Sequence, residues 1–322
     1  MKRGLVLGAL VILGALSAAL GAIEQAGAAQ PGGQQPASKT LDVDKVRDNL
    51  YVLRGGGGNT AAFITAGGVV LVDTKLAGWG KPILDKVKEL TDKPVTTIIN
   101  THTHFDHVSG NVEFPPTVEV LTQENTAKLM REMRAPTGVS NAPQQNIFTE
   151  NNGRGLPKRT FKDEMTLGSG NDRIELHYFG RAHTSGDAFV VFPALRVLHT
   201  GDVFPNKGIP IIDANNGGSG LDYPDTLAKA AALPDIDVVV TGHYTTTLAM
   251  ADLQMYRDFI REFTETVRTA KKDGRTVDDV ASTWKVPGRF LEAGYTQPPA
   301  NTSGQSASRL RMNVEIIWNE LK

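Results

Sequence analysis

The sequence predicts an α/β fold, and two observations carry that prediction. Between residues 41 and 73, short runs of β-branched and aromatic residues alternate with glycine-rich turns, which is typical of a strand meander. After them, residues 81–90 carry apolar side chains at helical spacing, and residues 95–100 form a largely apolar run typical of a buried strand. A strand, a helix and a further strand in this order indicate a βαβ unit.

The remaining elements follow from the same two periodicities. We expect strands at 51–53, 60–65, 68–73, 95–100, 174–179, 188–192, 196–200 and 238–241, and helices at 81–90, 226–233, 248–272 and 309–321. Residues 134–160 and 204–220 are rich in Gly, Pro and Asn and fit neither period. Loops of this length are typical of lids, binding loops or disorder, with plain surface loops as the alternative.

Composition excludes several classes of protein. The chain has 322 residues and no cysteine, so disulfides, Cys-ligated zinc, iron-sulfur clusters and thiol nucleophiles are excluded. Its formal net charge of −1 provides no electrostatic basis for binding nucleic acid, and we expect none as a partner.

The N-terminus has the order of a secretory signal peptide. Lys2 and Arg3 precede an apolar run, and the small residues 26–29 follow it, which predicts cleavage after Ala28 or Ala29. A retained membrane anchor is the alternative, because residues 5–23 approach the ~20 residues that span a bilayer. We therefore expect a signal peptide at 1–29, a Pro/Gly linker at 30–40 and a catalytic domain with C-terminal helices at 41–322. The mature protein would be periplasmic or secreted, with no membrane contact after cleavage.

The chemistry is concentrated directly after the apolar run 95–100. His102, His104, Asp106 and His107 fall within six residues, although the whole chain has only seven histidines. Imidazole is a preferred zinc ligand, and histidines at i and i+2 on extended backbone point to one side, so both can reach one ion. Asp106 and His107 can face a neighbouring ion. The alternatives are a solvated His-rich loop and an adventitious surface chelate.

Further candidate ligands follow three other predicted strands. His183 follows residues 174–179, Asp202 follows 196–200, and His243 follows 238–241. Strand ends that present His or Asp to one rim are what a metal site at a sheet edge requires. Each residue alone could be an ordinary polar residue, but with the His-rich motif all three are predicted ligands.

This succession of histidines and aspartates resembles the metallo-β-lactamase superfamily over residues 45–265. The resemblance implies a four-layer αββα sandwich with two metal ions at the edges of its sheets. It assigns His102, His104 and His183 to the first ion, Asp106, His107 and His243 to the second, and Asp202 as a bridge, with Asp73 supporting the site. The absent cysteine excludes subclasses that place Cys at the second metal, and His104 in place of Glu favours zinc over redox iron. Segments 182–187, 189–193 and 197–202 resemble exported members, including those associated with quinoproteins.

The predicted function is a dinuclear zinc hydrolase in which metal-bound hydroxide attacks a small-molecule substrate. Two ions about 3.5–4 Å apart can lower the pKa of a bridging water, and Asp106 could orient it or accept its proton. An ester or amide bond of a small cyclic substrate, β-lactam-like or lactone, is the first expectation. A phosphodiesterase, a thioesterase and a periplasmic accessory or metal-binding component of a quinoprotein-type redox system are the alternatives. Iron or manganese could replace the two Zn²⁺.

Other polar residues are expected to be structural. His177 and His199 are interpreted as histidines within strands, and Asp187 as a turn-stabilising carboxylate. Four residues flank the ligand segments and could contact substrate, with packing favoured for each: Tyr223, Tyr244, Arg181 and Lys207. The run Gly55–Gly58 is not a phosphate cradle, because no helix pattern or Gly-Lys-Ser/Thr follows it.

Overall fold

The computed structural model describes residues 39–298 and 305–322, with side chains of residues 305–308 left undescribed. The predicted signal peptide at 1–29 and most of the predicted linker at 30–40 lie outside the described residues. Within the described part of the chain, every helix is too short or too polar to cross a membrane.

The first sheet has seven strands in chain order. β2 (Leu50–Arg54), β3 (Thr60–Thr65) and β4 (Gly68–Val72) form the expected antiparallel meander, and β1 (Asp42–Arg47) adds an antiparallel strand beside β2. β5 (Val95–Asn100), β6 (Glu119–Gln123) and β7 (Arg159–Phe161) then extend it as parallel strands. Helix α1 (Gly80–Leu90) joins β4 to its parallel neighbour β5, which is the predicted βαβ unit.

The second sheet has six strands in the order β13-β12-β11-β10-β9-β8. Its strands are β8 (Glu164–Leu167), β9 (Ile174–His177), β10 (Phe189–Phe192), β11 (Val197–His199), β12 (Val238–Val240) and β13 (Leu248–Ala249). β11 and β12 are parallel, and helix α5 (Tyr223–Ala231) lies between them in the chain. Because these two strands run in the same direction, the loops that follow them leave the same edge of the sheet.

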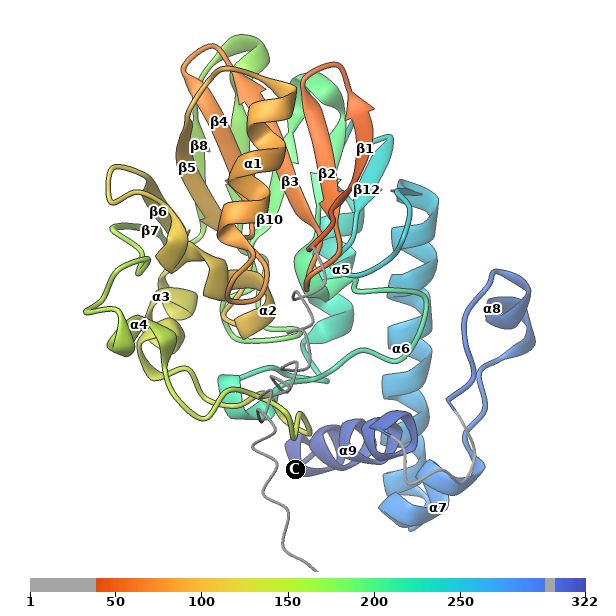
Figure 1. Ribbon diagram of the computed structural model, residues 1–322. Helices are drawn as coiled ribbons and strands as arrows, with labels where there is room; N and C mark the ends of the chain where they lie inside the picture. The colour runs from red at the N-terminus through yellow and green to blue at the C-terminus, as the bar shows by residue number, and fades with distance from the viewer. Residues whose placement is uncertain (1–38, 299–304) are drawn as a thin grey trace, which may run out of the picture. The chain divides into compact units, whose positions relative to one another are not determined.

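The alternation of apolar residues produces the layers. On β4, Val69 and Leu71 pack with Ile83 and Val87 of α1, whereas Val70 and Val72 pack with strands of the second sheet. Residues on the outer face of the second sheet, such as Val239, pack against α5 and α6 (Met250–Lys272). Figure 1 shows α1 in front of β3, β4 and β5, with strands of the second sheet behind them. The four-layer αββα arrangement is therefore confirmed.

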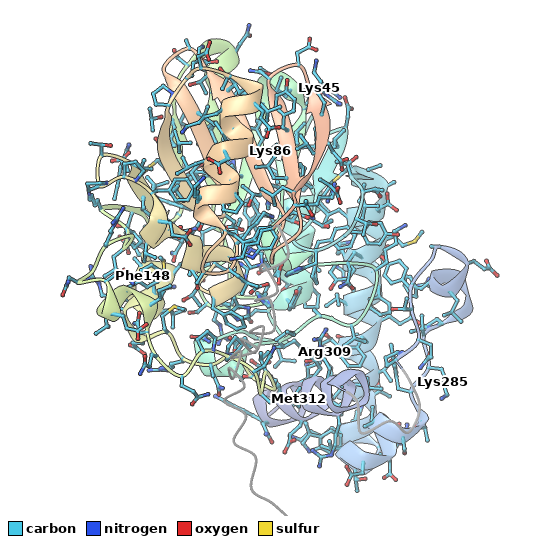
Figure 2. All side chains as sticks on the ribbon, in the orientation of Figure 1. Lys45, Lys86, Phe148, Lys285, Arg309 and Met312 are labelled. Atoms are coloured by element: carbon cyan, nitrogen blue, oxygen red, sulfur yellow. The ribbon has the colours of Figure 1, made fainter. Side chains whose placement is uncertain are left out.

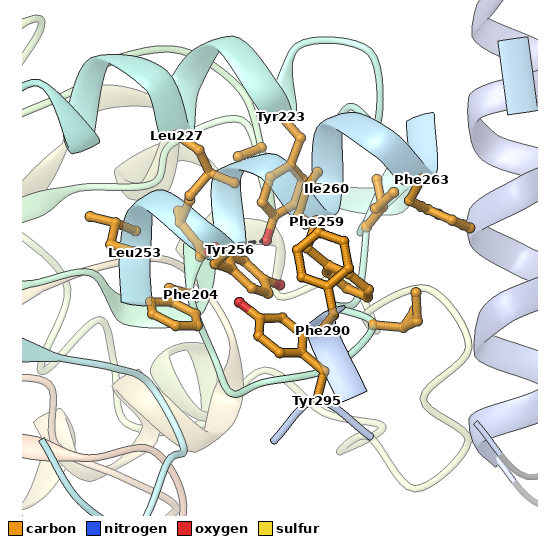
Figure 3. Close-up of a cluster of buried hydrophobic side chains, with 14 of the residues drawn as sticks. Phe204, Tyr223, Leu227, Leu253, Tyr256, Phe259, Ile260, Phe263, Phe290 and Tyr295 are labelled. Atoms are coloured by element: carbon orange, nitrogen blue, oxygen red, sulfur yellow. Dashed lines mark hydrogen bonds between the residues drawn. The ribbon is translucent and has the colours of Figure 1, made fainter. Parts of the chain in front are cut away.

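The helical layer over the second sheet continues into the C-terminal helices α7 (Val277–Thr283), α8 (Gly288–Glu292) and α9 (Gln305–Glu320). Its core is aromatic: Phe259 lies 4.8 Å from Tyr295, 5.1 Å from Phe290 and 6.1 Å from Tyr256, measured between ring centroids. Figure 3 shows these rings together between the helices. The buried apolar face of α6 is thus part of this core.

The structure adds elements that the patterns did not predict. These are β1, β6, β7, β8, β13, α7, α8, the nine-residue α3 (Glu124–Glu132) and the one-turn helices α2 (Phe105–Val108) and α4 (Ile147–Glu150). Residues 134–160 are therefore not wholly irregular, because they contain α4 and the start of β7. Helix α5 begins at Tyr223, three residues before the prediction, because Pro224 is favourable in a first turn.

Candidate metal centre

The candidate ligands all leave strands at one edge of the sandwich. The His-rich motif follows β5: His102 lies in a bend, His104 is extended, and α2 carries Asp106 and His107. From the second sheet, His183 follows β9, Asp202 lies in a 3-10 turn (Gly201–Val203) after β11, and His243 follows β12. Both sheets therefore contribute, and the structure brings all seven predicted residues together.

One group consists of His102, His104, His183 and Asp202, whose candidate ligand atoms all lie within 4.8 Å of one another. His104 Nδ1 and His183 Nε2 are 3.0 Å apart, and His183 Nε2 is 3.8 Å from Asp202 Oδ2. Two nitrogens bound to one tetrahedral zinc at ~2.0–2.1 Å would be roughly 3.4 Å apart, so this spacing fits a shared ion.

A second group consists of Asp106, His107 and His243. His107 Nε2 lies 3.3 Å from His243 Nε2, and His243 Nε2 lies 3.3 Å from Asp106 Oδ2. Asp202 reaches this group too, because its Oδ1 is 3.3 Å from His107 Nε2 and its Oδ2 is 3.2 Å from His243 Nε2. Asp202 therefore lies between the two groups, where a bridging ligand would lie.

The histidines are held by the ring nitrogen that faces away from the cluster. His107 Nδ1 is 2.7 Å from Asp73 Oδ2, and His183 Nδ1 is 2.7 Å from the backbone oxygen of Ile211. The Thr101 hydroxyl donates its hydrogen to Asp73. The Thr101 hydroxyl oxygen can therefore accept a hydrogen bond from His102 Nδ1, which lies 2.9 Å away. Such contacts fix the tautomer and direct the other nitrogen toward a metal.

Asp213 gives His104 the same support, since its Oδ2 lies 2.7 Å from His104 Nε2. Burial raises the pKa of Asp213, but the hydrogen bonds from His104, Asn216 and Thr137 outweigh it and hold that pKa well below its ordinary value. The sequence patterns did not identify Asp213, because it lies in the irregular stretch 204–220 and follows no strand.

Unpaired buried atoms at the cluster fit a metal ion. Among the side chains that the structure describes, neither His102 Nε2 nor Asp202 Oδ1 has a hydrogen-bond partner, and both residues are buried. Burial, together with the neighbouring histidines, lowers the pKa of His102 well below its ordinary value, and burial lowers that of His183 to about 4. Both imidazoles are therefore neutral at pH 7, which is the form that binds zinc.

Glycines and a buried lysine let the loops around the candidate ligands pack close together. A Cβ at Gly58 would overlap the His107 ring, and one at Gly242 would overlap Asp202 Oδ1. Lys75 is fully buried, and its Nζ donates to the backbone oxygens of Leu53 at 2.9 Å and Gly58 at 2.7 Å. The run Gly55–Gly58 thus packs beneath the metal motif. Lysine is almost never fully buried, so this role of Lys75 could not be predicted from the sequence.

The residues expected to be structural have structural contacts. The Asp187 carboxylate accepts hydrogen bonds from the backbone N–H and the hydroxyl of Thr184, which stabilises the turn. The buried His199 faces the backbone oxygen of Asn59 at 3.3 Å, and the partly exposed His177 lies 3.6 Å from Glu175. The four flanking residues also have structural contacts: the Tyr223 hydroxyl donates to the backbone oxygen of Asp202, Arg181 pairs with Asp222, Lys207 pairs with Asp252, and the backbone oxygen of Tyr244 accepts from Arg54.

A cavity of about 380 Å³ opens onto both groups. Asp106, His183 and His243 line it, and so do apolar residues such as Leu76 and Phe105. Cavities of roughly 300–1,000 Å³ are typical of small-molecule sites. The geometry is therefore suited to bringing a small substrate to the ligand cluster.

Comparisons with known proteins agree with this arrangement. The chain is 26% identical over 169 residues to the hydroxyacylglutathione hydrolase of Trichodesmium erythraeum, covering 51% of this chain and 55% of that protein. It is 26% identical over 213 residues to the 2,4-dinitroanisole O-demethylase subunit alpha of Nocardioides sp., covering 64% and 58%. The chain thus spans a little more than half the length of these two relatives.

Among solved structures, the fold is similar to a metallo-beta-lactamase from Pontibacter korlensis, with a TM-score of 0.56 and 21% identity. The match covers 69% of this chain and 99% of that one. The sequence profile of the metallo-beta-lactamase superfamily matches residues 53–243, which span all seven candidate ligands. Because this match covers more than half of the chain, the protein belongs to the metallo-beta-lactamase superfamily.

Proposed function

We propose that this protein is a hydrolase that holds two zinc ions and cleaves an ester or amide bond of a small cyclic substrate, β-lactam-like or lactone. One observation carries the proposal: seven imidazole and carboxylate side chains come together from both sheets, and five of them line one cavity. In this proposal His102, His104 and His183 hold one ion, Asp106, His107 and His243 hold the other, and Asp202 bridges them. Two ions held in this way supply Lewis acidity, which lowers the pKa of a bound water and polarises a carbonyl oxygen.

Asp106 has the most direct access to substrate among the carboxylates. Its side chain is 22% exposed, against 8% for Asp202, and it lines the cavity. Burial raises the pKa of Asp106, but His107 and His243 outweigh it and lower that pKa to about 2. Asp106 is therefore ionised at neutral pH and a weak proton acceptor, so orienting the attacking water by hydrogen bonding suits it better than removing its proton.

The proposal includes a setting and a partner. The partner is a small molecule, since the cavity has the volume of a small-molecule site and the net charge of −1 does not attract nucleic acid. The signal-like order of the first 29 residues supports a mature protein in the periplasm or outside the cell.

A thioester is the second candidate substrate. The observation that favours it is the match to a hydroxyacylglutathione hydrolase over half of this chain. The same ligands and the same cavity would serve this reaction, so the substrate must be separated by experiment.

We expect His102→Ala to lose zinc and to lower kcat at least a hundredfold, because it removes a ligand whose Nε2 has no other partner in the described part of the chain. Zinc content by elemental analysis and turnover of a panel would measure both effects. The panel is a chromogenic cephalosporin, a homoserine lactone, a thioester and a bis-aryl phosphate. His177→Ala, outside the cluster, is the matched control.

The outcomes separate the candidates. Turnover of the cephalosporin or lactone supports the proposal. Turnover of the thioester alone favours the second candidate, a thioester substrate. Zinc-loaded protein that cleaves none of the four favours an accessory role in a redox system. Full activity in a metal-free His102→Ala protein would reject metal-dependent hydrolysis.

A further inference from the structure

Apart from the candidate histidine ligands, the cavity beside the metal ligands has one basic side chain among its described lining residues. This is Arg309, which shares the cavity with Asp106, Asp202 and His243. Arg309 belongs to α9, and the superfamily match ends at residue 243. A helix outside the matched region therefore supplies part of the cavity wall.

Packing fixes the position of Arg309. The next residue, Leu310, and Val314 one turn later are buried in the aromatic core beneath the second sheet, which holds α9 in place. Figure 2 labels Arg309 near the start of the described side chains of α9. The guanidinium is thus carried by a packed helix, which limits how far it can move from the cavity.

Arg309 has no ion-pair or hydrogen-bond partner among the residues that the structure describes. Arg311 on the same helix differs, because it pairs with Asp278 at 2.8 Å and Glu315 at 2.8 Å. Burial lowers the pKa of Arg309, and the nearby Asp202 carboxylate opposes that shift. A partly buried guanidinium remains charged, and burying that charge without a partner costs free energy. The arrangement therefore favours binding of an anionic ligand from solvent.

A second cavity, of about 320 Å³, adjoins the first at Arg309. The two cavities share Arg309 and Asn206, and the second is otherwise lined by Gly208, Ile209, Thr296, Gln297 and Pro298. None of its described lining residues is acidic, so an anion there would meet the guanidinium without a competing carboxylate.

We propose that Arg309 is a specificity residue that binds an anionic group of the substrate, a carboxylate or a sulfate-like group, while the scissile bond lies at the metal ligands. This inference rests on the proposed function and narrows its substrate class to small molecules with a negative charge beside the reacting bond. Guanidinium pairs well with both kinds of anion, because its N–H groups match two oxygens at once.

The first test compares a chromogenic cephalosporin that carries its free carboxylate with the methyl ester of the same compound. Arg309→Met should raise the KM for the free carboxylate roughly tenfold to a hundredfold, the range for losing a hydrogen bond to a charged group. The kcat and the KM for the methyl ester should change little. Arg309→Lys should restore part of the difference. Arg311→Met, on the same helix, is the control and should match the wild type.

The second test measures binding without turnover. Calorimetric titration of zinc-loaded protein with hexanoate, hexyl sulfate and neutral hexanamide should show anion binding that Arg309→Met weakens and Arg311→Met does not. The two anions distinguish a carboxylate site from a sulfate site. Equal binding of the anions by Arg309→Met would show that they bind the metals alone and would overturn the inference.

The two proposals fail in different ways. Zinc-loaded protein that cleaves nothing but still binds anions through Arg309 would reject the hydrolase and keep the anion site. Turnover in which Arg309→Met lowers activity toward both cephalosporins equally, or toward neither, would keep the hydrolase and reject a specificity role. Thermal unfolding of Arg309→Met would identify a folding defect, and Arg309→Lys, which keeps the charge, would then carry the comparison.

Discussion

At the scale of single residues, the cluster of candidate metal ligands depends on the histidine ring nitrogens that face away from the metal position. The Asp213 carboxylate accepts from His104 Nε2 while also accepting from the backbone N–H and the hydroxyl of Thr137, each at 2.9 Å. One carboxylate thus connects a predicted ligand with the loop at 134–160. The irregular loops therefore help to hold a ligand as well as to line the cavity.

We expect Asp213→Asn to lower zinc affinity about tenfold to a hundredfold, because the amide can donate to His104 Nε2 and so favour the wrong tautomer. Titration of zinc against a competing chelator measures the change. Asp235→Asn, an exposed site in an ion pair with Arg196, is the control. Unchanged zinc affinity in Asp213→Asn would show that His104 needs no such support.

The charge of His243 makes zinc binding depend on pH. In the metal-free protein burial lowers the pKa of His243, but the Asp202 and Asp106 carboxylates outweigh it and raise that pKa to about 9. Zinc requires the neutral imidazole, so binding must displace a proton. The apparent zinc affinity should rise as pH increases from 7 to 9, by about tenfold per unit for each proton displaced.

Calorimetry in buffers of different protonation enthalpy would count the protons released at pH 7, and at least one is expected. Because the pKa of His243 is raised in the folded protein, protonated His243 also stabilises the metal-free fold. That contribution is complete below the ordinary pKa of 6.5 and is lost as the pH rises through about 9. Zinc binding without proton release would contradict this assignment of charge.

At the scale of elements, the ends of the strands decide which residues can meet. β12 ends at Val240, and Gly242 then passes so close to Asp202 that any side chain would overlap its carboxylate. Gly242→Ala should therefore displace Asp202, with loss of zinc and at least a hundredfold loss of kcat. Zinc content and turnover measure this effect. Gly67→Ala, in the turn between β3 and β4 with no atom within 4 Å of the added methyl, is the control.

Elements with a strong apolar periodicity were predicted correctly from the sequence. The buried strand β5 and helix α1 were predicted within one residue of their ends, because their apolar positions follow one period. β7 has only three residues and β8 alternates over only four, so neither is long enough for a period to be recognised. β7 pairs with β6, which lies far earlier in the sequence, so a local pattern does not contain its partner, whereas β8 pairs with the next strand, β9.

The same limit applies to the site. The seven candidate ligands could be predicted because each follows a strand or belongs to the dense His-rich motif. Asp213, Lys75 and Arg309 could not, because their roles depend on contacts with residues 17 to 109 positions away or on the cavity they line. Metal ligation itself remains a prediction for all seven, and the experiments above test it.

At the scale of the whole molecule, the aromatic core beneath the second sheet holds the C-terminal helices. Phe259 of α6 is 1% exposed and contacts rings from α8 and from the segment after it. Phe259→Ala should lower the free energy of unfolding by about 3–5 kcal/mol, the usual range for a buried Phe. Met255→Ala, at a side chain 37% exposed on the same helix, should have a much smaller effect. Denaturant unfolding measures both, and equal effects would show that this core is not a major source of stability.

The division of the candidate ligands between the two sheets has a consequence for the order of assembly. The first sheet contributes the His-rich motif, and the second contributes His183, Asp202 and His243. Neither sheet alone carries a complete ligand set, so an ion can be captured fully only after the two sheets have docked. Metal loading would then be a late event that reports on completed folding, and an ion once bound would join the two sheets and slow their separation.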